Sequence, residues 1–276
     1  MIALVRQRSA QAINAKYTGA PKKQSDRELL FARRAALKDS SNLFTFNESF
    51  WKNAKTQLKK ESNGKCAYCE ANTQVVAHGD VEHYRPKNTY WWLAYTYDNY
   101  LYACQMCNQT YKSDNFPTGP KKFPKPTVTK TTTDEKIEKM AGTISPDPVD
   151  IKQGFTLTRY LNAHKAEAAH LINPYIENPE IYFAYEADDT TQEVKVVTTE
   201  PQFAIHAKAA EDFYGINRIE LRNARYQSFA KFRAFKMAYP LLPDGLVKND
   251  VKKQIDDMLS DKYLFAGMNR FFNKKF

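Results

Sequence analysis

Several features are missing from this sequence of 276 residues, and each absence excludes a class of protein. No apolar run approaches the roughly 18 residues that a membrane-spanning helix needs, so we expect no span. The apolar opening Ile2–Val5 stops at Arg6, which is too short for the core of a secretion signal. Glycine is scarce, with 9 residues, and no G-x-x-x-x-G-K-[ST] loop occurs. We therefore expect no nucleotide hydrolysis by a P-loop of this chain.

Cysteine is also rare, and its placement is informative. The four cysteines form two C-x-x-C pairs, Cys66 with Cys69 and Cys104 with Cys107. So few cysteines in a chain of this size do not suggest a disulfide scaffold. Two such pairs supply the tetrahedral set of four thiolates that Zn²⁺ prefers, whereas thiol exchange would need only one dithiol. The sequence therefore predicts a structural zinc site and a reducing compartment.

The net charge of +10 is concentrated at one end of the sequence. Residues 1–60 hold 13 basic and 4 acidic side chains, whereas residues 61–120 hold 4 and 6. A basic segment on a nearly neutral body indicates contact with a polyanion or with an acidic partner surface. Of these two alternatives, docking to a partner protein is favoured. The slightly acidic second segment suits a divalent-cation site.

Composition divides the chain into four segments. Residues 1–60 are predicted to form a basic helical N-terminal arm, and residues 61–120 contain all four cysteines. Residues 121–150 form a connector rich in Pro, Thr and Lys, where little regular structure is expected. Residues 151–276 are predicted to be helical with one hairpin. Whether these segments form one domain or two is left open by the length.

Apolar spacing and capping residues predict individual elements. In the first segment we expect two helices, one starting at Asp26 as N-cap and one with Asn47 or Ser49 as N-cap and Gly64 at its C′ position. The expected helices are Asp26–Lys38, Phe46–Lys60, Arg218–Tyr239 and Asn249–Leu259, and the expected strands are Ile181–Tyr185 and Glu193–Thr198.

The segment between and after the cysteine pairs carries a recognisable series of motifs. V-E-H-Y-R-P-K at Val81–Lys87 is followed by Asn99 and then by C-x-x-C-N-x-x-x-K at Cys104–Lys112. In this order the motifs resemble those of the HNH endonucleases. Together with N-P-x-x-x-N-P-E at Asn173–Glu180 and the stretch Gly215–Arg222, they are most similar to the nuclease subunit of Septu-type and retron-associated antiviral defence systems.

The resemblance implies a fold. HNH enzymes have a ββα-metal core, in which a β-hairpin and a helix surround one divalent cation. We therefore expect an α+β protein that is predominantly helical, with a zinc-stabilised ββα-metal core and helical additions at its N- and C-terminal ends.

The resemblance also implies roles for four polar residues, and their chemistry agrees with it. A neutral imidazole is a suitable base near pH 7, which assigns the activation of water to His83. Glu82 and Asn108 offer the oxygen ligands that Mg²⁺ or Mn²⁺ requires. Asn99 would orient the His83 ring. The family often has Asp in place of Glu82 and His in place of Asn108, but both residues present here can bind a metal.

Three basic residues of the motifs are candidates for contact with the scissile phosphate. Arg85 and Lys87 follow His83 closely, although solvated charge is an almost equally good interpretation of both. Lys112 lies on the helix that would present the metal site, which makes it the better candidate.

The sequence thus predicts a metal-dependent HNH endonuclease in a bacterial cytoplasm. The substrate would be nucleic acid, DNA rather than RNA, with RNA such as tRNA as the alternative. By resemblance, an ABC/SMC-like ATPase would be the partner, and a retron or another nucleic acid could be associated. A zinc-stabilised nucleic-acid-binding or adaptor protein without catalysis is the competing hypothesis. The complete set of Glu82, His83, Asn99 and Asn108 argues against it.

Overall fold

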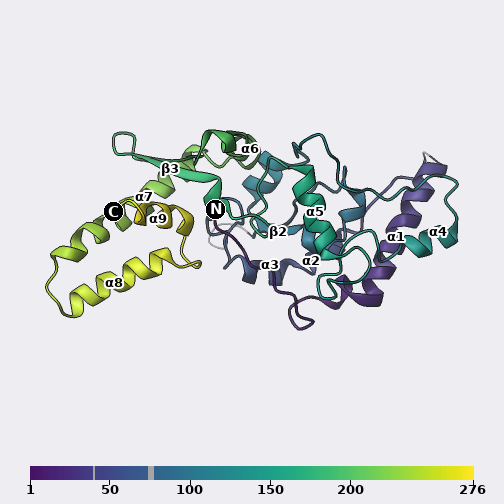
Figure 1. Cartoon of the computed structure of the whole chain (residues 1–276), viewed down its shortest axis with the longest axis horizontal. Coiled ribbons are helices and arrows are strands. Elements are labelled where there is room, and N and C mark those ends of the chain that lie inside the picture. The colour runs from purple at the N-terminus through teal and green to yellow at the C-terminus, as the bar shows by residue number, and fades with distance from the viewer. Residues whose placement is uncertain (40, 74–77) are drawn as a thin grey trace.

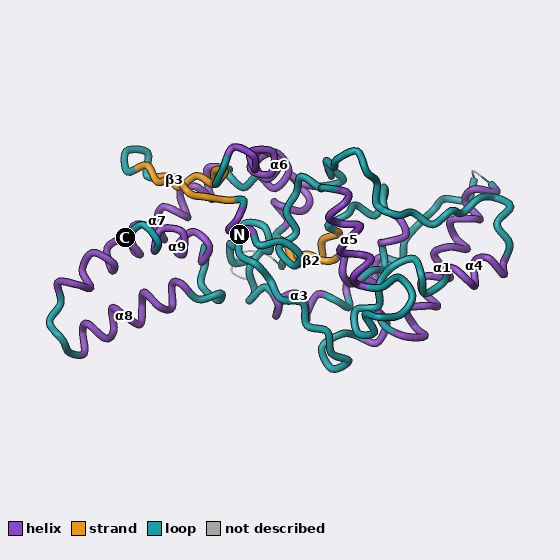
Figure 2. Tube along the Cα trace, viewed as in Figure 1, coloured by secondary structure: helices purple, strands orange, loops and turns teal. Residues whose placement is uncertain are grey.

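The computed structural model describes residues 1–39, 41–73 and 78–276. Positions 40 and 74–77, which belong to the predicted segments 1–60 and 61–120, lie outside the described residues. In the described part, helices outnumber strands, and the strands form two antiparallel pairs. The prediction of a mostly helical α+β protein is confirmed at this level. Figures 1 and 2 show an elongated molecule with α1 and α4 at one end and α7 and α8 at the other.

The elements are named by their order along the chain. The helices are α1 (Gly19–Lys38), α2 (Glu48–Lys52), α3 (Lys55–Glu61), α4 (Asp134–Met140), α5 (Leu157–Glu167), α6 (Ala204–Tyr214), α7 (Ile219–Ala238), α8 (Leu246–Leu259) and α9 (Ala266–Asn273), and a π-helical segment covers Met106–Lys112. The strands are β1 (Asp80–His83), β2 (Tyr100–Ala103), β3 (Phe183–Asp188) and β4 (Glu193–Thr198).

Helix α1 begins earlier than the sequence predicted. Its first residue is Gly19, whose N–H donates to Asp147 Oδ2 at 2.7 Å. Asp26, predicted as the N-cap, lies inside the helix, where its buried carboxylate accepts from Lys22 Nζ at 2.7 Å. The predicted start was wrong because the group that caps this helix comes from a residue 128 positions away.

The single helix predicted over Phe46–Lys60 is divided into α2 and α3. Asn47 caps α2 as predicted, because its side chain accepts from the Ser49 N–H. The helix α3 ends in a Schellman turn, in which the Gly64 N–H donates to the Lys59 carbonyl at 2.8 Å. Asn63, with φ +53°, therefore holds the C′ position predicted for Gly64. The expected apolar face is buried at Phe50, Ala54 and Leu58.

The N-terminal and connector segments both pack against other parts of the chain. Arg6 forms an ion pair with Glu61 at 3.1 Å, and Arg8 forms one with Asp98 at 2.5 Å. The connector contains α4, which the density of proline did not predict, and α4 lies beside α1 (Figure 1). The division of the chain into four segments stays a prediction.

The elements predicted beyond residue 180 are confirmed with small shifts. Strands β3 and β4 pair from Phe183 with Thr198 to Asp188 with Glu193. The long helix α7 is preceded by Arg218 as its N-cap, and α8 begins at Leu246, three residues before the predicted start. Helix α9 was not predicted.

The strand pair β1–β2 lies between two apolar cores. Its register joins Glu82 with Leu101 and His83 with Tyr100. Because side chains alternate along a strand, Leu101 belongs to the core built from the cysteines and the C-terminal elements, and Tyr100 belongs to the core built from α1–α3 and the tryptophans. This position fixes both faces of the strands that carry the motif residues.

Candidate active site and metal site

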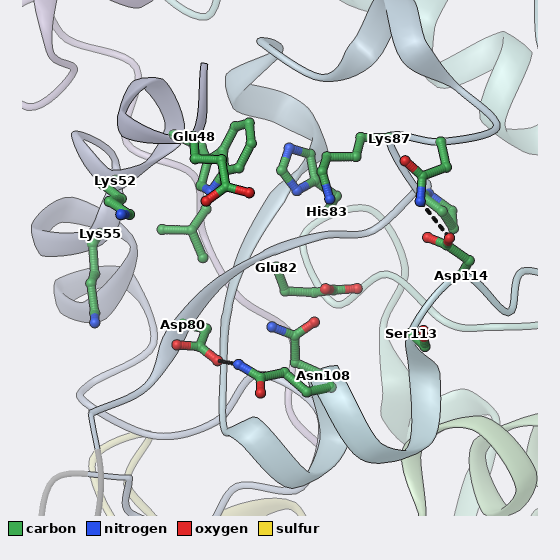
Figure 3. A pocket seen from close by; sticks show the side chains of 15 residues that line it. Glu48, Lys52, Lys55, Asp80, Glu82, His83, Lys87, Asn108, Ser113 and Asp114 are labelled. Atoms are coloured by element: carbon green, nitrogen blue, oxygen red, sulfur yellow. Dashed lines mark hydrogen bonds between the residues drawn. The ribbon is translucent and has the colours of Figure 1, made fainter. Parts of the chain in front are cut away.

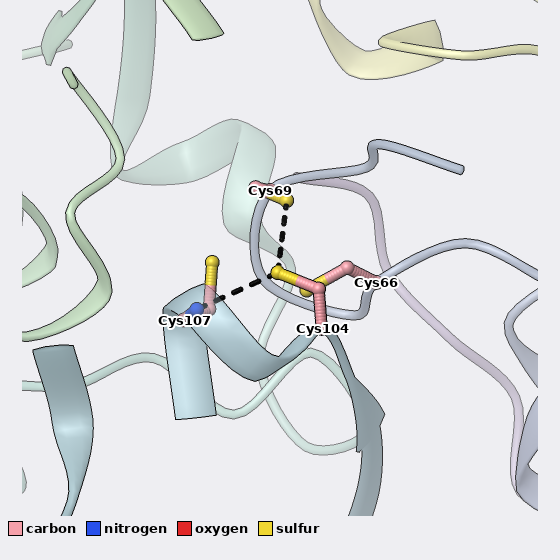
Figure 4. A group of neighbouring side chains, drawn as sticks. All are labelled: Cys66, Cys69, Cys104 and Cys107. Carbon is pink, nitrogen blue, oxygen red and sulfur yellow. Dashed lines mark hydrogen bonds between the residues drawn. The ribbon is translucent and has the colours of Figure 1, made fainter. Parts of the chain in front are cut away.

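The four cysteines converge as the sequence predicted. All four Sγ atoms lie within 4.8 Å of one another, and the Sγ atoms of Cys69 and Cys104 are 4.0 Å apart (Figure 4). Zn–S bonds of about 2.3 Å in a tetrahedron place sulfurs about 3.8 Å apart. Cys66, Cys69 and Cys107 are buried. The cluster therefore fits a structural zinc ion.

The Gly215–Arg222 stretch packs against this cluster. Arg218 Nη1 lies 3.5 Å from Cys107 Sγ, where its charge would offset the negative charge of a four-thiolate site. Gly215 has φ +57°, and a Cβ at this position would lie 2.5 Å from the Tyr111 ring on the π-helical segment. The stretch thus supports both the cysteine cluster and the segment that follows β2.

A cavity of about 610 Å³ opens beside β1. Three segments that are distant in the sequence line it: the α2–α3 region, β1 with the residues after it, and the π-helical segment with its C-terminal end. Among the predicted site residues, Glu82, His83, Lys87 and Asn108 line this cavity. Figure 3 shows Glu82 between His83 and Asn108.

The His83 ring is held by a backbone carbonyl. Its Nε2 lies 3.0 Å from the Ala94 oxygen, which also accepts from the Tyr100 hydroxyl at 2.6 Å. A carbonyl can only accept, so Nε2 carries the hydrogen and Nδ1 is the basic nitrogen. Burial lowers the pKa of His83 to about 3, which keeps the ring neutral. Trp51 and Tyr100 pack edge-to-face on it, with centroids 4.8 and 5.1 Å away.

Asn99 has a different place from the one predicted. Its Oδ1 accepts from the Arg85 N–H and its Nδ2 donates to the Arg85 carbonyl, both at 2.9 Å. A further, longer bond runs to the Leu93 carbonyl. Ala94, rather than Asn99, therefore orients the His83 ring directly. Asn99 fixes the backbone two residues beyond the histidine.

Glu82 is paired with Lys112. Their charged atoms are 2.6 Å apart, and Lys112 Nζ also donates to the His83 carbonyl at 3.0 Å. Burial raises the pKa of Glu82, and the lysine opposes this effect. Because Lys112 is 0% exposed, the structure places it behind Glu82 and outside the cavity where a phosphate contact was expected.

Arg85 is also directed away from the cavity. Its side chain is 0% exposed and forms an ion pair with Glu167 at 2.7 Å. Tyr160 and His164 complete the surroundings of its guanidinium. The expected phosphate contact at Arg85 is therefore replaced by a buried network. Of the three basic candidates, Lys87 lines the cavity.

Sequence reasoning missed the contribution of α2 and α3 to the cavity. Trp51, Lys52 and Lys55 line it, together with Glu48. The available signal was indirect: Lys52 and Lys55 lie off the apolar face of Phe50, Ala54 and Leu58, whereas Trp51 packs against the edge of that core and also lines the cavity.

Comparisons with known proteins give a partial match. No protein-family model and no solved structure matches the chain. Septu protein PtuB of Bacillus mycoides (strain KBAB4) is 37% identical to it over 87 residues. The match covers 27% of this chain and 30% of that relative, so the similarity concerns one part of each protein. Within the described ranges, no helix is long and apolar enough to cross a membrane.

Proposed function

We propose that this chain is a metal-dependent HNH endonuclease that hydrolyses phosphodiester bonds, with DNA as the preferred substrate over RNA. The observation that carries the proposal is the meeting of His83, Glu82 and Asn108 at one cavity. A neutral base lies there beside a carboxylate and an amide, which together provide the groups that hydrolysis of a phosphodiester needs. The β1–β2 pair followed by the π-helical segment agrees with the strand–strand–helix order of an HNH core.

His83 would act as the general base through Nδ1. The Ala94 carbonyl holds the hydrogen on Nε2, and the Tyr100 hydroxyl holds the carbonyl in turn. Nδ1 is therefore unprotonated before any substrate binds and is available to take a proton from the attacking water. Burial lowers the pKa and keeps the ring neutral near pH 7, and it also makes Nδ1 a weaker proton acceptor than a free imidazole.

The donor set suits a hard divalent cation. Glu82 offers a carboxylate oxygen and Asn108 an amide carbonyl, and Mg²⁺ or Mn²⁺ bound through oxygen keeps several waters. Such an ion would stabilise the charge on the phosphate and on the leaving oxygen. Lys112 favours the ionised form of Glu82, which is the form that binds a cation. A structural Zn²⁺ would be bound by Cys66, Cys69, Cys104 and Cys107.

The partial likeness to Septu protein PtuB supports a role in bacterial antiviral defence. In that setting we propose a cytoplasmic complex with an ABC/SMC-like ATPase, in which this chain is the nuclease. A retron or another associated nucleic acid would be an alternative source of target choice. The gene next to the one that encodes this chain would distinguish these systems, because an ATPase gene and a retron would each be found there.

The test compares His83→Ala with the parent chain on duplex DNA and tRNA, with Mg²⁺, in the presence and absence of the partner ATPase. We expect cleavage to disappear while zinc content stays at the parent value. His78→Ala is the matched control, since His78 is exposed and lies two residues before the start of β1. Undiminished cleavage by His83→Ala would show that the base is a different residue.

A second candidate function has one observation in its favour. The Lys112 ammonium forms an ion pair with a Glu82 oxygen at 2.6 Å. This pairing would neutralise Glu82 without a cation, as expected in a protein that binds nucleic acid and has no catalytic metal. Tight DNA binding with no Mg²⁺-dependent cleavage, even with the partner present, would favour this zinc-stabilised binding or adaptor protein.

A further inference from the structure

Three lysines line the cavity without forming ion pairs in the described structure. Lys52 comes from α2, Lys55 from α3 and Lys87 from the segment after β1. Lys87 Nζ lies 5.7 Å from the Trp51 ring centroid. Glu48 precedes Lys52 by one helical turn and also lines the cavity, yet no ion pair joins the two. Among the described residues, no carboxylate therefore forms an ion pair with any of these three lysines, and all three line the cavity.

The other carboxylates of the cavity are engaged. Asp80 accepts from Gln109 at 2.7 Å, and Asp114 accepts from Asn88 at 2.6 Å. Glu82 is paired with Lys112. An anion that enters the cavity thus meets three ammonium groups without ion-pair partners, while Glu82 is neutralised by Lys112 and Glu48, Asp80 and Asp114 keep their negative charge.

The rest of the N-terminal segment uses much of its positive charge internally. Arg6, Arg8 and Lys22 form ion pairs with carboxylates inside the fold. Arg27 and Arg34 on α1 pair with carboxylates of α4. The excess charge noticed in residues 1–60 is therefore partly neutralised, while Lys52 and Lys55 remain available at the cavity.

We propose that Lys52, Lys55 and Lys87 bind the sugar–phosphate backbone on both sides of the phosphodiester bond that is cleaved beside His83. The inference rests on the proposed nuclease function and adds the path of the substrate strand. In Figure 3, Lys52 and Lys55 lie on the far side of the cavity from Asp114, and Lys87 lies beside His83. A polyanion that runs past His83 would contact Lys52 and Lys55 at one place and Lys87 at another.

The experiment measures DNA binding as a function of salt, using the full chain with its zinc and without Mg²⁺. The slope of log K against log salt is negative, and each lost phosphate contact reduces its magnitude by about 0.9 for duplex DNA and about 0.7 for a single strand. Lys52→Gln/Lys55→Gln should therefore reduce the magnitude of the slope by about 1.8 or about 1.4 and weaken binding at low salt. The matched control Lys59→Gln/Lys60→Gln removes the same charge from α3, outside the cavity lining.

An unchanged slope for Lys52→Gln/Lys55→Gln, or an equal drop for Lys59→Gln/Lys60→Gln, would overturn the inference. So would a variant that keeps its slope but no longer co-purifies with the ATPase, because the lysines would then contact a protein. The measurement needs no cleavage. A reduced slope without Mg²⁺-dependent cutting would refute the nuclease proposal alone, and His83-dependent cutting with an unchanged slope would refute the strand path alone.

Discussion

The buried pair of Arg85 and Glu167 offers a decisive test of the structural role given to Arg85. Arg85 Nε and Nη2 lie 2.8 and 2.7 Å from Glu167 Oε2, and both side chains are 0% exposed. The second oxygen of Glu167 accepts from the Tyr90 hydroxyl at 2.6 Å. Replacement of Glu167 by Leu would leave the guanidinium buried without a counter-charge.

The expected cost follows from the burial. Removal of one partner of a fully buried ion pair destabilises a protein by about 3–5 kcal/mol, because the remaining charge has lost its compensation. For 276 residues, an unfolding entropy of about 2.1 cal/mol/K per residue converts this loss into a Tm lower by about 5–9 °C. The single variant Arg85→Met should be destabilised for the related reason that Glu167 is then unpaired.

Scanning calorimetry on Glu167→Leu, Arg85→Met and the double variant gives the measurement. We expect the double variant to lose less stability than the two single losses combined, because no charge is left unpaired. The exposed pair Asp244 and Lys248 serves as the control, since the removal of a solvent-exposed ion pair should leave the Tm almost unchanged. If Arg85→Met kept the parent Tm but bound DNA with a lower salt slope, Arg85 would be a phosphate contact after all.

Three further predictions concern the metal, the base and its neighbour. Cys69→Ser should lower the zinc content measured by mass spectrometry below one ion per chain and lower the Tm; a normal zinc content would refute the four-thiolate site. Burial lowers the pKa of His83 from 6.5 to about 3, so stability is full above about pH 6.5 and falls by up to about 1.4 kcal/mol per pH unit on acidification towards pH 3. Denaturant titrations from about pH 7.5 to 4.5 should show a shallower loss for His83→Gln; equal curves would contradict this. For the proposed nuclease, Trp51→Ala should lower kcat more than it raises KM, and Trp51→Phe should restore most of kcat, since the Trp51 ring packs on His83 and supports the position that the Ala94 hydrogen bond sets; an effect on KM alone would count against this role.

Sequence reasoning succeeded where the determining interactions are local. The spacing within each C-x-x-C pair predicted the cysteine cluster, and the apolar stripe predicted α7 almost to the residue. The pattern around β3 and β4 gave their pairing for the same reason.

The sequence did not predict features that depend on a group distant in the chain. Asp147 sets the start of α1, and the Ala94 backbone oxygen, which has no residue signature, orients His83. A charged residue in a motif also does not reveal its direction. Arg85 and Lys112 were both expected at the phosphate, yet each finds a buried carboxylate whose proximity only the folded chain establishes.

The position of the cysteine cluster has a consequence for the freedom of the chain. Cys69 and Cys104 are 35 residues apart, and β1 with Glu82 and His83, as well as β2, lie in the loop between them. A metal held at both ends of this loop would act as a cross-link. A covalent link that closes a loop of this length restricts the unfolded chain by about 4 kcal/mol. Loss of a bound zinc ion would free β1 and β2 together. A chelator that removes the zinc would then disrupt the proposed site without binding in the cavity.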